Sequence, residues 1–65
     1  MHIYLNGEER STEAENVRAL LVELGMEGRM IAIERNLEVV PKSTYAETVL
    51  VEGDRIEVVH MIGGG

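Results

Sequence analysis

The sequence contains no cysteine, no phenylalanine and no tryptophan, and it has only one proline. Without cysteine, the chain has no disulfide bond, no thiolate metal site and no cysteine nucleophile. This absence is compatible with the cytoplasm, where we expect the protein to reside. Without Phe and Trp, the core must be built from Ile, Leu, Val and Met. These absences leave a small aliphatic core as the source of stability.

Long apolar runs and basic clusters are also missing. No run approaches the roughly 20 apolar residues of a membrane-spanning helix, and the first residues do not resemble a signal peptide. The net charge is −6, without a basic stripe, so we expect neither nucleic acid nor membrane as a partner. An excess of acidic residues favours a partner with a basic surface, although such an excess often serves only to keep a protein in solution. A chain of 65 residues is expected to form one domain.

Both ends of the sequence have the residue pattern of β-strands. Residues 1–5 alternate between apolar and polar, which predicts a half-buried strand. Asn6-Gly7 predicts a type I′ hairpin turn, and the polar residues 8–11 predict a returning strand at a sheet edge. Residues 55–62 are rich in β-branched side chains and predict the last strand. Because the first and last strands are the most apolar, we expect them side by side and parallel in the sheet interior.

An apolar stripe after residue 16 predicts an amphipathic helix of about nine residues. Asn16 is a suitable N-cap, and Gly25 lies where a left-handed C-terminal cap is needed. So short a helix must pack on a sheet to be stable. The stripe consists of Val17, Leu20, Leu21 and Leu24.

The middle of the chain predicts two further strands. Residues 31–33 begin one strand, and Arg35-Asn36 can form a turn after it. Residues 37–40 can then form a strand that pairs back with the first one, and this strand ends at Pro41, which cannot donate a ladder hydrogen bond. Residues 43–48 predict a short helical turn capped by Ser43 or Thr44, and 49–51 form an apolar linker or short strand. A turn at 52–54 precedes the last strand. The sequence therefore predicts an α+β fold, with a mixed sheet of four to five strands and one main helix on one face.

Candidate catalytic residues are sparse. Ser11 and Ser43 stand in polar connections without a neighbouring histidine. His2 and His60 lie on strands that we expect to be adjacent, so they could approach each other, but two ligands do not make a metal site. Half-exposed strand histidines are the reading we favour. We expect no enzymatic activity, no bound metal and no enclosed pocket of ligand size.

Alternation in the last strand predicts a contact surface. If Ile56 and Val58 point into the core, Val59 and Met61 point outward. Exposed apolar side chains can mark a contact with another protein. The alternatives are a second core on this face, or a segment near Tyr45 that covers it. The predicted partner-binding residues are Tyr4, Val59, Met61 and Ile62.

Three glycines follow that strand, so we expect a domain over residues 1–62 and a flexible tail over 63–65. Three extended residues reach roughly 10 Å, and without side chains they can thread a narrow channel. The carboxyl group of Gly65 would arrive at its far end. A carboxylate is inert until activated, for example by joining to AMP, and a partner enzyme must do this. The alternative is a frayed terminus or a cloning scar.

The whole sequence resembles the ThiS family of small sulfur carriers. The resemblance rests on the opening MHIYLNG, the helix VRALL, the run IAIERN with Val40-Pro41 after it, and above all the ending VEGDRIEVVHMIGGG. That ending combines a Gly-Asp turn, a β-branched strand and a terminal Gly-Gly. The family motif requires two glycines, so Gly63 is an extra one, and the aromatic core residues common in relatives are missing here.

The resemblance implies a ubiquitin-like β-grasp fold and a role as a carried reactant. A ubiquitin-activating-like adenylyltransferase (ThiF-type) would use MgATP to adenylate Gly65, while Gly63 and Gly64 thread its site. A persulfide sulfur donor would then give a thiocarboxylate, whose sulfur passes to thiazole synthase (ThiG-type) for the thiazole ring of thiamin. The free carrier is expected to be a monomer without a bound cofactor. The alternatives are a molybdopterin-synthase-type carrier subunit and a plain β-grasp interaction module.

Overall fold

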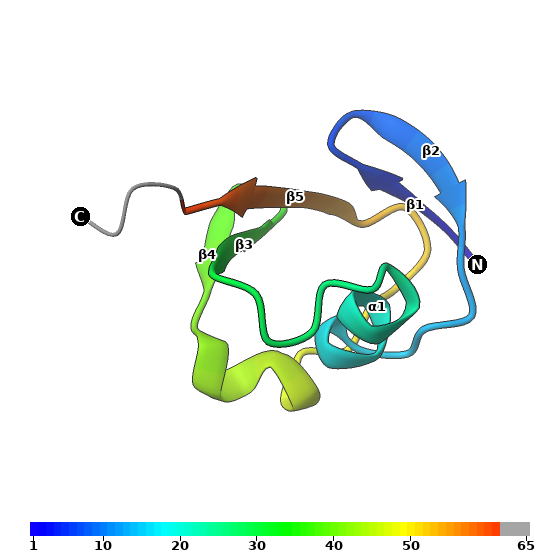
Figure 1. The fold of residues 1–65 in the computed structure, drawn as a ribbon. Coiled ribbons are helices and arrows are strands. Elements are labelled where there is room, and N and C mark those ends of the chain that lie inside the picture. Colours follow the sequence, from blue (N-terminus) through cyan, green and yellow to red (C-terminus); the bar gives the residue numbers. More distant parts are fainter. Residues whose placement is uncertain (62–65) are drawn as a thin grey trace.

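A β-hairpin opens the chain in the computed structural model, which describes residues 1–61 (Figure 1). Its strands are β1 (His2–Leu5) and β2 (Glu8–Ser11), which pair antiparallel. Asn6 and Gly7 make the turn with φ values of 50° and 86°, the left-handed geometry that an Asn-Gly pair favours. The predicted turn is confirmed, and so is the position of β2 at a sheet edge.

The helix α1 (Val17–Glu23) begins at the predicted cap. The side-chain oxygen of Asn16 accepts a hydrogen bond from the backbone N–H of Ala19 at 2.8 Å. The helix has 7 residues, fewer than expected, because Leu24 already lies at its C-terminal cap. Gly25 follows with φ of 71°, the predicted left-handed position.

The hairpin and the helix are joined through one carboxylate. Glu23, at the end of α1, accepts a hydrogen bond from the Thr12 hydroxyl at 2.7 Å and another from Nε of Arg10 at 3.2 Å. The Thr12 hydrogen bond is the main cause that lowers the pKa of Glu23. These contacts fix the orientation of the hairpin relative to α1.

Strands β3 (Ile31–Arg35) and β4 (Glu38–Val40) form a second hairpin. The predicted turn at Arg35-Asn36 is shifted by one residue, because Asn36 and Leu37 take the positive φ values of 53° and 72°. Leucine rarely adopts this conformation. Strand β4 therefore begins at Glu38 and not at Leu37.

The predicted short helical turn is a 3-10 helix, η1 (Lys42–Glu47). The predicted caps are wrong: Pro41 precedes η1, and no side chain caps it. The Thr44 hydroxyl instead donates to the Pro41 carbonyl at 2.8 Å. The apolar linker after η1 pairs with the start of α1 only through an isolated bridge between Val49 and Asn16.

Strand β5 (Arg55–His60) lies in the middle of a five-stranded sheet with the order β2-β1-β5-β3-β4. It runs parallel to β1 and antiparallel to β3. The predicted parallel pairing of the first and last strands is confirmed. The predicted strand extended to Ile62, which lies outside the described residues, as does the proposed tail at 63–65.

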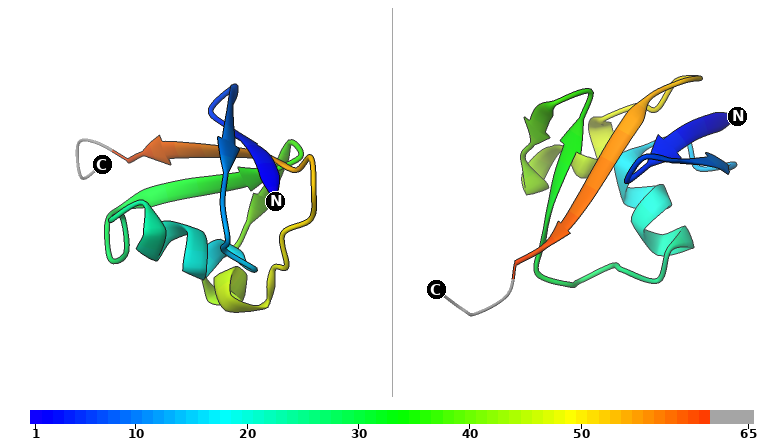
Figure 2. Two further views of the ribbon diagram at one scale, coloured as in Figure 1. Left: turned by 90° about the vertical axis from the view of Figure 1, so that its right-hand side faces the viewer. Right: turned by 90° about the horizontal axis from the view of Figure 1, so that it is seen from above.

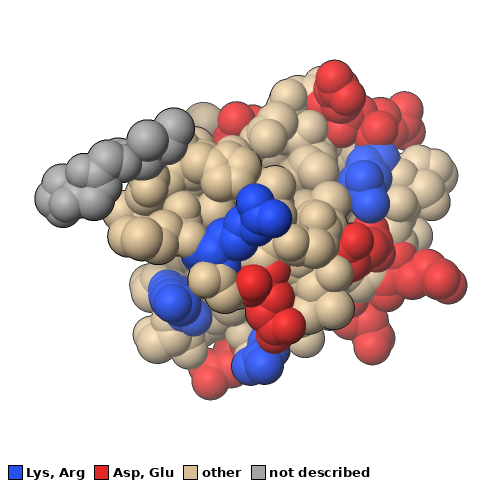
Figure 3. Space-filling model, in the orientation of Figure 1, with Lys and Arg blue, Asp and Glu red and all other residues tan. Residues whose placement is uncertain are grey.

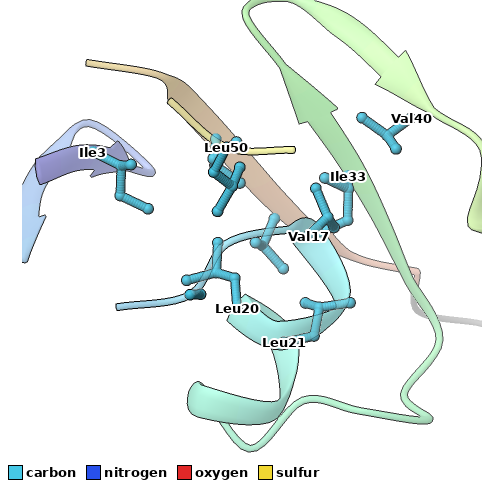
Figure 4. Packing of buried hydrophobic residues seen from close by; sticks show 10 residues of the cluster. Ile3, Val17, Leu20, Leu21, Ile33, Val40 and Leu50 are labelled. Atoms are coloured by element: carbon cyan, nitrogen blue, oxygen red, sulfur yellow. The ribbon is translucent and has the colours of Figure 1, made fainter. Parts of the chain in front are cut away.

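Helix α1 and η1 lie on the same side of the sheet (Figures 1 and 2). The predicted α+β class, with one main helix on one face of a mixed sheet, is confirmed. Within residues 1–61, no helix is both long and apolar enough to span a membrane. The core fills the space between α1 and the sheet (Figure 4) and consists of Ile3, Ala14, Val17, Leu20, Leu21, Ile33, Val40, Leu50, Ile56 and Val58.

Candidate functional site

The end of β5 is the point from which the chain leaves the sheet. His60 lies opposite Ile31, and the backbone N–H of Met61 donates to the Met30 carbonyl at 2.9 Å. Figure 1 shows this end on the opposite side of the molecule from the β1–β2 hairpin. A protein that receives residues 62–65 must therefore approach this end of the sheet. The predicted roles of Ile62, Gly63, Gly64 and Gly65 lie outside the described residues.

The two faces of β5 differ as the alternation predicts. Ile56 and Val58 are buried, with exposed fractions of 0% and 8%. Val59 is 53% exposed, and Met61, just after the strand, is 56% exposed. The inward positions of Ile56 and Val58 and the outward position of Val59 are thus confirmed. Met61 is exposed, but it lines a groove on the helix side together with Leu21 and Tyr45, so its expected place on the same face as Val59 is wrong. The binding role of Val59 and Met61 stays a prediction.

Tyr4 lies on the same outer face of the sheet as Val59. It is 38% exposed and pairs across the strands with Arg55, whose guanidinium carbon is 5.2 Å from the ring centroid. Val59 lies four residues after Arg55 along β5, which places it about 13 Å from the pair formed by Tyr4 and Arg55. A partner must therefore cover most of β5 to contact both side chains.

Sequence reasoning missed one exposed residue on this face. Val39 is 70% exposed, because its neighbour Val40 points into the core. Val39 lies opposite Glu34 on β3, and Val59 lies opposite Ala32 on the same strand. The sequence contained a signal for this exposure, because Val39 and Val40 are neighbours in a strand that ends before Pro41 and must therefore point to opposite faces. We define the outer sheet surface as Tyr4, Ala32, Val39 and Val59.

Nothing in residues 1–61 covers this surface as a second layer. Tyr45, which could have folded over it, belongs to η1 and packs against the core on the helix side. The alternative of a second core or a covering segment is therefore wrong for the described residues. The outer sheet surface is available to another protein.

A pair of like charges lies next to the exposed valines. Glu34 on β3 is directly opposite Glu57 on β5, and both residues are half-buried. Carboxylates in this position repel each other and weaken the sheet. A basic side chain from a partner would relieve that repulsion.

The turn before β5 is anchored by a buried carboxylate. Asp54 is 4% exposed and accepts hydrogen bonds from Nε of Arg35 and the Val51 N–H, both at 2.9 Å. The Asn36 amide donates to its other oxygen at 3.1 Å. Burial alone would raise the pKa of Asp54, but the hydrogen bonds from Val51, Arg35 and Asn36 outweigh it and lower the pKa. Asp54 therefore fixes where β5 begins.

The two histidines do not approach each other. Because β1 and β5 run parallel with Tyr4 opposite Arg55, His2 lies near the start of β5 and His60 at its end. Nδ1 of His2 is 3.6 Å from a carboxylate oxygen of Glu52. The approach of His2 to His60 that the sequence left open therefore does not occur, and residues 1–61 contain no cluster of three metal-ligating side chains.

Comparison with known proteins agrees with this geometry. The model of the ThiS family matches residues 3–65. The sulfur carrier protein ThiS of Bacillus subtilis is 34% identical over 65 residues, covering 97% of this chain and 98% of that protein. A thiazole synthase of Paramagnetospirillum magneticum is 53% identical over 66 residues, which include all of this chain but only 20% of the synthase.

A solved structure shows the same architecture. The crystal structure of the thiamine biosynthesis protein ThiS from Geobacter metallireducens covers 100% of both chains at 30% identity, with a TM-score of 0.86. This likeness confirms the predicted β-grasp fold. From the family match and the full-length relative, we conclude that this chain belongs to the ThiS family.

Proposed function

We propose that this chain is a sulfur carrier whose Gly65 carboxyl group is activated and converted to a thiocarboxylate. Family membership is the observation that carries the proposal, because the family's full-length relatives from Bacillus subtilis and Thermus thermophilus are sulfur carrier proteins. The position and exposure of the end of β5 support it. The carrier is a reactant, and its partners supply the catalysis.

The chemistry has three steps. A ThiF-type adenylyltransferase joins the Gly65 carboxylate to AMP from MgATP and releases pyrophosphate. A persulfide sulfur donor then attacks the acyl carbon, AMP leaves, and an acyl disulfide joins carrier and donor. A second thiol attacks the donor's sulfur in that disulfide, so the thiocarboxylate is released and the second thiol and the donor are left joined as a disulfide. Thiazole synthase of the ThiG type accepts this sulfur for the thiazole ring. The proposal requires a free carboxyl group at Gly65.

The body of the domain holds the reactive end in place for these partners. The side chains of Val59 and Met61 are exposed beside the point where the chain leaves the sheet, so a partner can bury them while it takes residues 62–65. Burial of apolar area supplies affinity without any catalytic group on the carrier. Tyr4 extends the contact along β5, and Gly63 and Gly64 fit a channel that excludes side chains.

Thiazole formation is favoured over other sulfur-transfer pathways by one observation. Two thiazole synthases contain a stretch similar to the whole of this chain, at 53% and 50% identity. A carrier-like segment within the synthase itself supports an association between this chain and a ThiG-type enzyme.

The experiment is an intact-mass measurement. The chain is incubated with its host's ThiF-type enzyme, MgATP, a persulfide donor and a thiol reductant. We expect a mass gain equal to the replacement of one oxygen by one sulfur. No gain, with a folded chain and an enzyme that adenylates another carrier, would favour the plain interaction module. Transfer of the sulfur to molybdopterin synthase, and not to thiazole synthase, would favour the molybdopterin pathway.

A further inference from the structure

The helix side of the molecule contains an open groove of ≈ 450 Å³. It runs between α1 and η1 and reaches the loop before β3 and the end of β5. We call it the α1–η1 groove. No enclosed pocket of ligand size was expected in so small a domain, and this groove is open to solvent. Its apolar lining includes Leu21, Met26, Ile31, Tyr45 and Met61.

Most of the protein's methionine side chains lie in the lining of this groove. Three of the four methionines line it, namely Met26, Met30 and Met61. Met30 and Met61 are 66% and 56% exposed. Methionine is flexible and polarisable, and exposed methionines are frequent on surfaces that bind other proteins. The lining therefore favours a bound apolar side chain over solvent.

The rim of the groove is basic, although the chain as a whole carries a net charge of −6. Arg18, Arg29 and Lys42 line the groove together with a single acidic residue, Glu27. Arg18 is paired with Glu27 at 3.2 Å, whereas Arg29 and Lys42 form no ion pair with any other residue of 1–61. Figure 3 shows acidic side chains gathering toward the β1–β2 hairpin, away from the end of β5. An acidic occupant would be attracted to this rim and repelled elsewhere.

We propose that the α1–η1 groove binds an acidic segment of the partner protein that receives the tail, with a large apolar side chain between carboxylates. The identity of that partner rests on the proposed function. Met61 lines the groove and also lies where the chain leaves β5, so a protein holding residues 62–65 lies within reach of the groove. The partner then contacts both faces of the sheet, one through the outer sheet surface and the other through the α1–η1 groove.

The first test needs no sulfur chemistry. The isotope-labelled chain is titrated with a short blocked peptide that has central leucines between glutamates, and NMR shifts are mapped. We expect shifts at Leu21, Ile31 and Tyr45 that weaken with added salt. The matched peptide with lysines in place of glutamates should bind far less. Equal binding of the two peptides, or shifts confined to the outer sheet surface, would overturn the proposal.

The second test uses the partner. Affinity for the ThiF-type enzyme is measured without ATP for Arg29→Gln and for Lys42→Gln. Each is expected to bind about two- to fivefold more weakly, while sulfur loading at saturating enzyme is retained. Arg10→Gln removes the same charge outside the groove lining. Because the Thr12 hydroxyl still holds Glu23, the hairpin keeps its place and this variant should bind as the parent does. Unchanged affinity in both groove variants would overturn the proposal even if the carrier is fully active.

Two other occupants are tested directly. If a second copy filled the groove, sedimentation would show a dimer that Lys42→Gln dissociates. If the chain's own tail filled it, removing residues 62–65 would shift the same groove resonances that the peptide shifts. Either result would overturn the proposal. Failure of sulfur loading, with peptide binding intact, would overturn only the proposed function.

Discussion

Arg35 and Asp54 form an ion pair, with 2.9 Å between Nε and Oδ2, that ties the turn between β3 and β4 to the turn before β5. Asp54 is almost fully buried, whereas the Arg35 side chain is about one-third exposed. The pair therefore fixes the starting point of the strand that leads to the candidate site. Removing the Asp54 carboxylate leaves three donors, on Arg35, Asn36 and the Val51 backbone, without their acceptor.

Asp54→Asn is expected to lower the free energy of unfolding by about 2 kcal/mol at neutral pH. The amide keeps the shape of the carboxylate but loses its charge and accepts fewer hydrogen bonds. Urea unfolding monitored by circular dichroism measures the change. Glu47→Gln, at an exposed carboxylate of η1, is the control. Equal stability of the two variants would show that the buried pair is not a stabilising contact.

The effect of Asp54→Asn should depend on pH. The pKa of Asp54 is lower in the folded chain than in the unfolded chain, so its carboxylate stabilises the fold above the unfolded pKa of about 3.9. That stabilisation is lost as the pH falls toward the folded pKa. Unfolding at a series of pH values should show a constant difference between parent and variant near neutral pH, which shrinks below about pH 4. A difference that grows in acid would contradict this assignment.

Glu57→Gln should stabilise the domain, since it removes the repulsion from Glu34 on the neighbouring strand. We expect a gain of about 0.5 kcal/mol at low salt, which declines as salt screens the charges. The same variant should bind the ThiF-type enzyme more weakly if a basic side chain of that enzyme meets this pair. Thermal unfolding and a binding titration separate the two effects, and a loss of stability would refute the repulsion.

Leu37 is 85% exposed and has φ of 72°, a conformation that strains a leucine. Leu37→Gly should therefore raise the free energy of unfolding by about 1 kcal/mol. Chemical denaturation provides the measurement. A destabilised variant would mean that the leucine side chain packs on the folded protein in solution.

Val59→Asp and Met61→Asp should weaken binding to the ThiF-type enzyme at least tenfold, roughly the cost of placing a charge in an apolar contact. Neither should unfold the domain, because both side chains are more than half exposed. Val49→Asp is the matched control, because Val49 is 61% exposed and is bridged to Asn16 at the start of α1. Should Met61→Asp unfold the chain instead, Met61 contributes to the core.

Removing Gly65 should leave thermal unfolding unchanged and abolish sulfur loading, because the shortened tail falls about 3.5 Å short of the adenylation site. Gly63→Ala keeps the length of the tail but places a methyl group at the entrance of the channel. Because the motif requires only the last two glycines, this variant should lose less loading than the shortened chain. Intact mass after reaction with the enzyme, MgATP and persulfide distinguishes the two variants. Full loading of the shortened chain would refute the role assigned to Gly65.

Local signals in the sequence predicted much of the fold. Asn6-Gly7 and Asn16 act within a few residues of their own position, so the first hairpin and the start of α1 followed from them. The alternation of Ile56, Val58 and Val59 predicted both faces of β5. These features depend on short-range geometry and on the period of a strand.

What the sequence could not predict depends on contacts between distant residues. The separation of His2 and His60 follows from the parallel register of β1 and β5, which no local pattern specifies. The turn at Asn36-Leu37 is held by residues far away in the sequence, because the Asn36 side chain donates to Asp54 and accepts from the Arg55 N–H. The α1–η1 groove is likewise formed by segments from three parts of the chain.

The place of β5 in the sheet has a consequence for synthesis. This central strand is the last one along the chain, and it pairs with β1, the first. During translation, the hairpins on either side remain unjoined until β5 has left the ribosome, so the sheet closes in a single late event. A chain that ends before β5 would lack the middle of its sheet and leave the two hairpins without the strand that joins them, so we expect it not to fold.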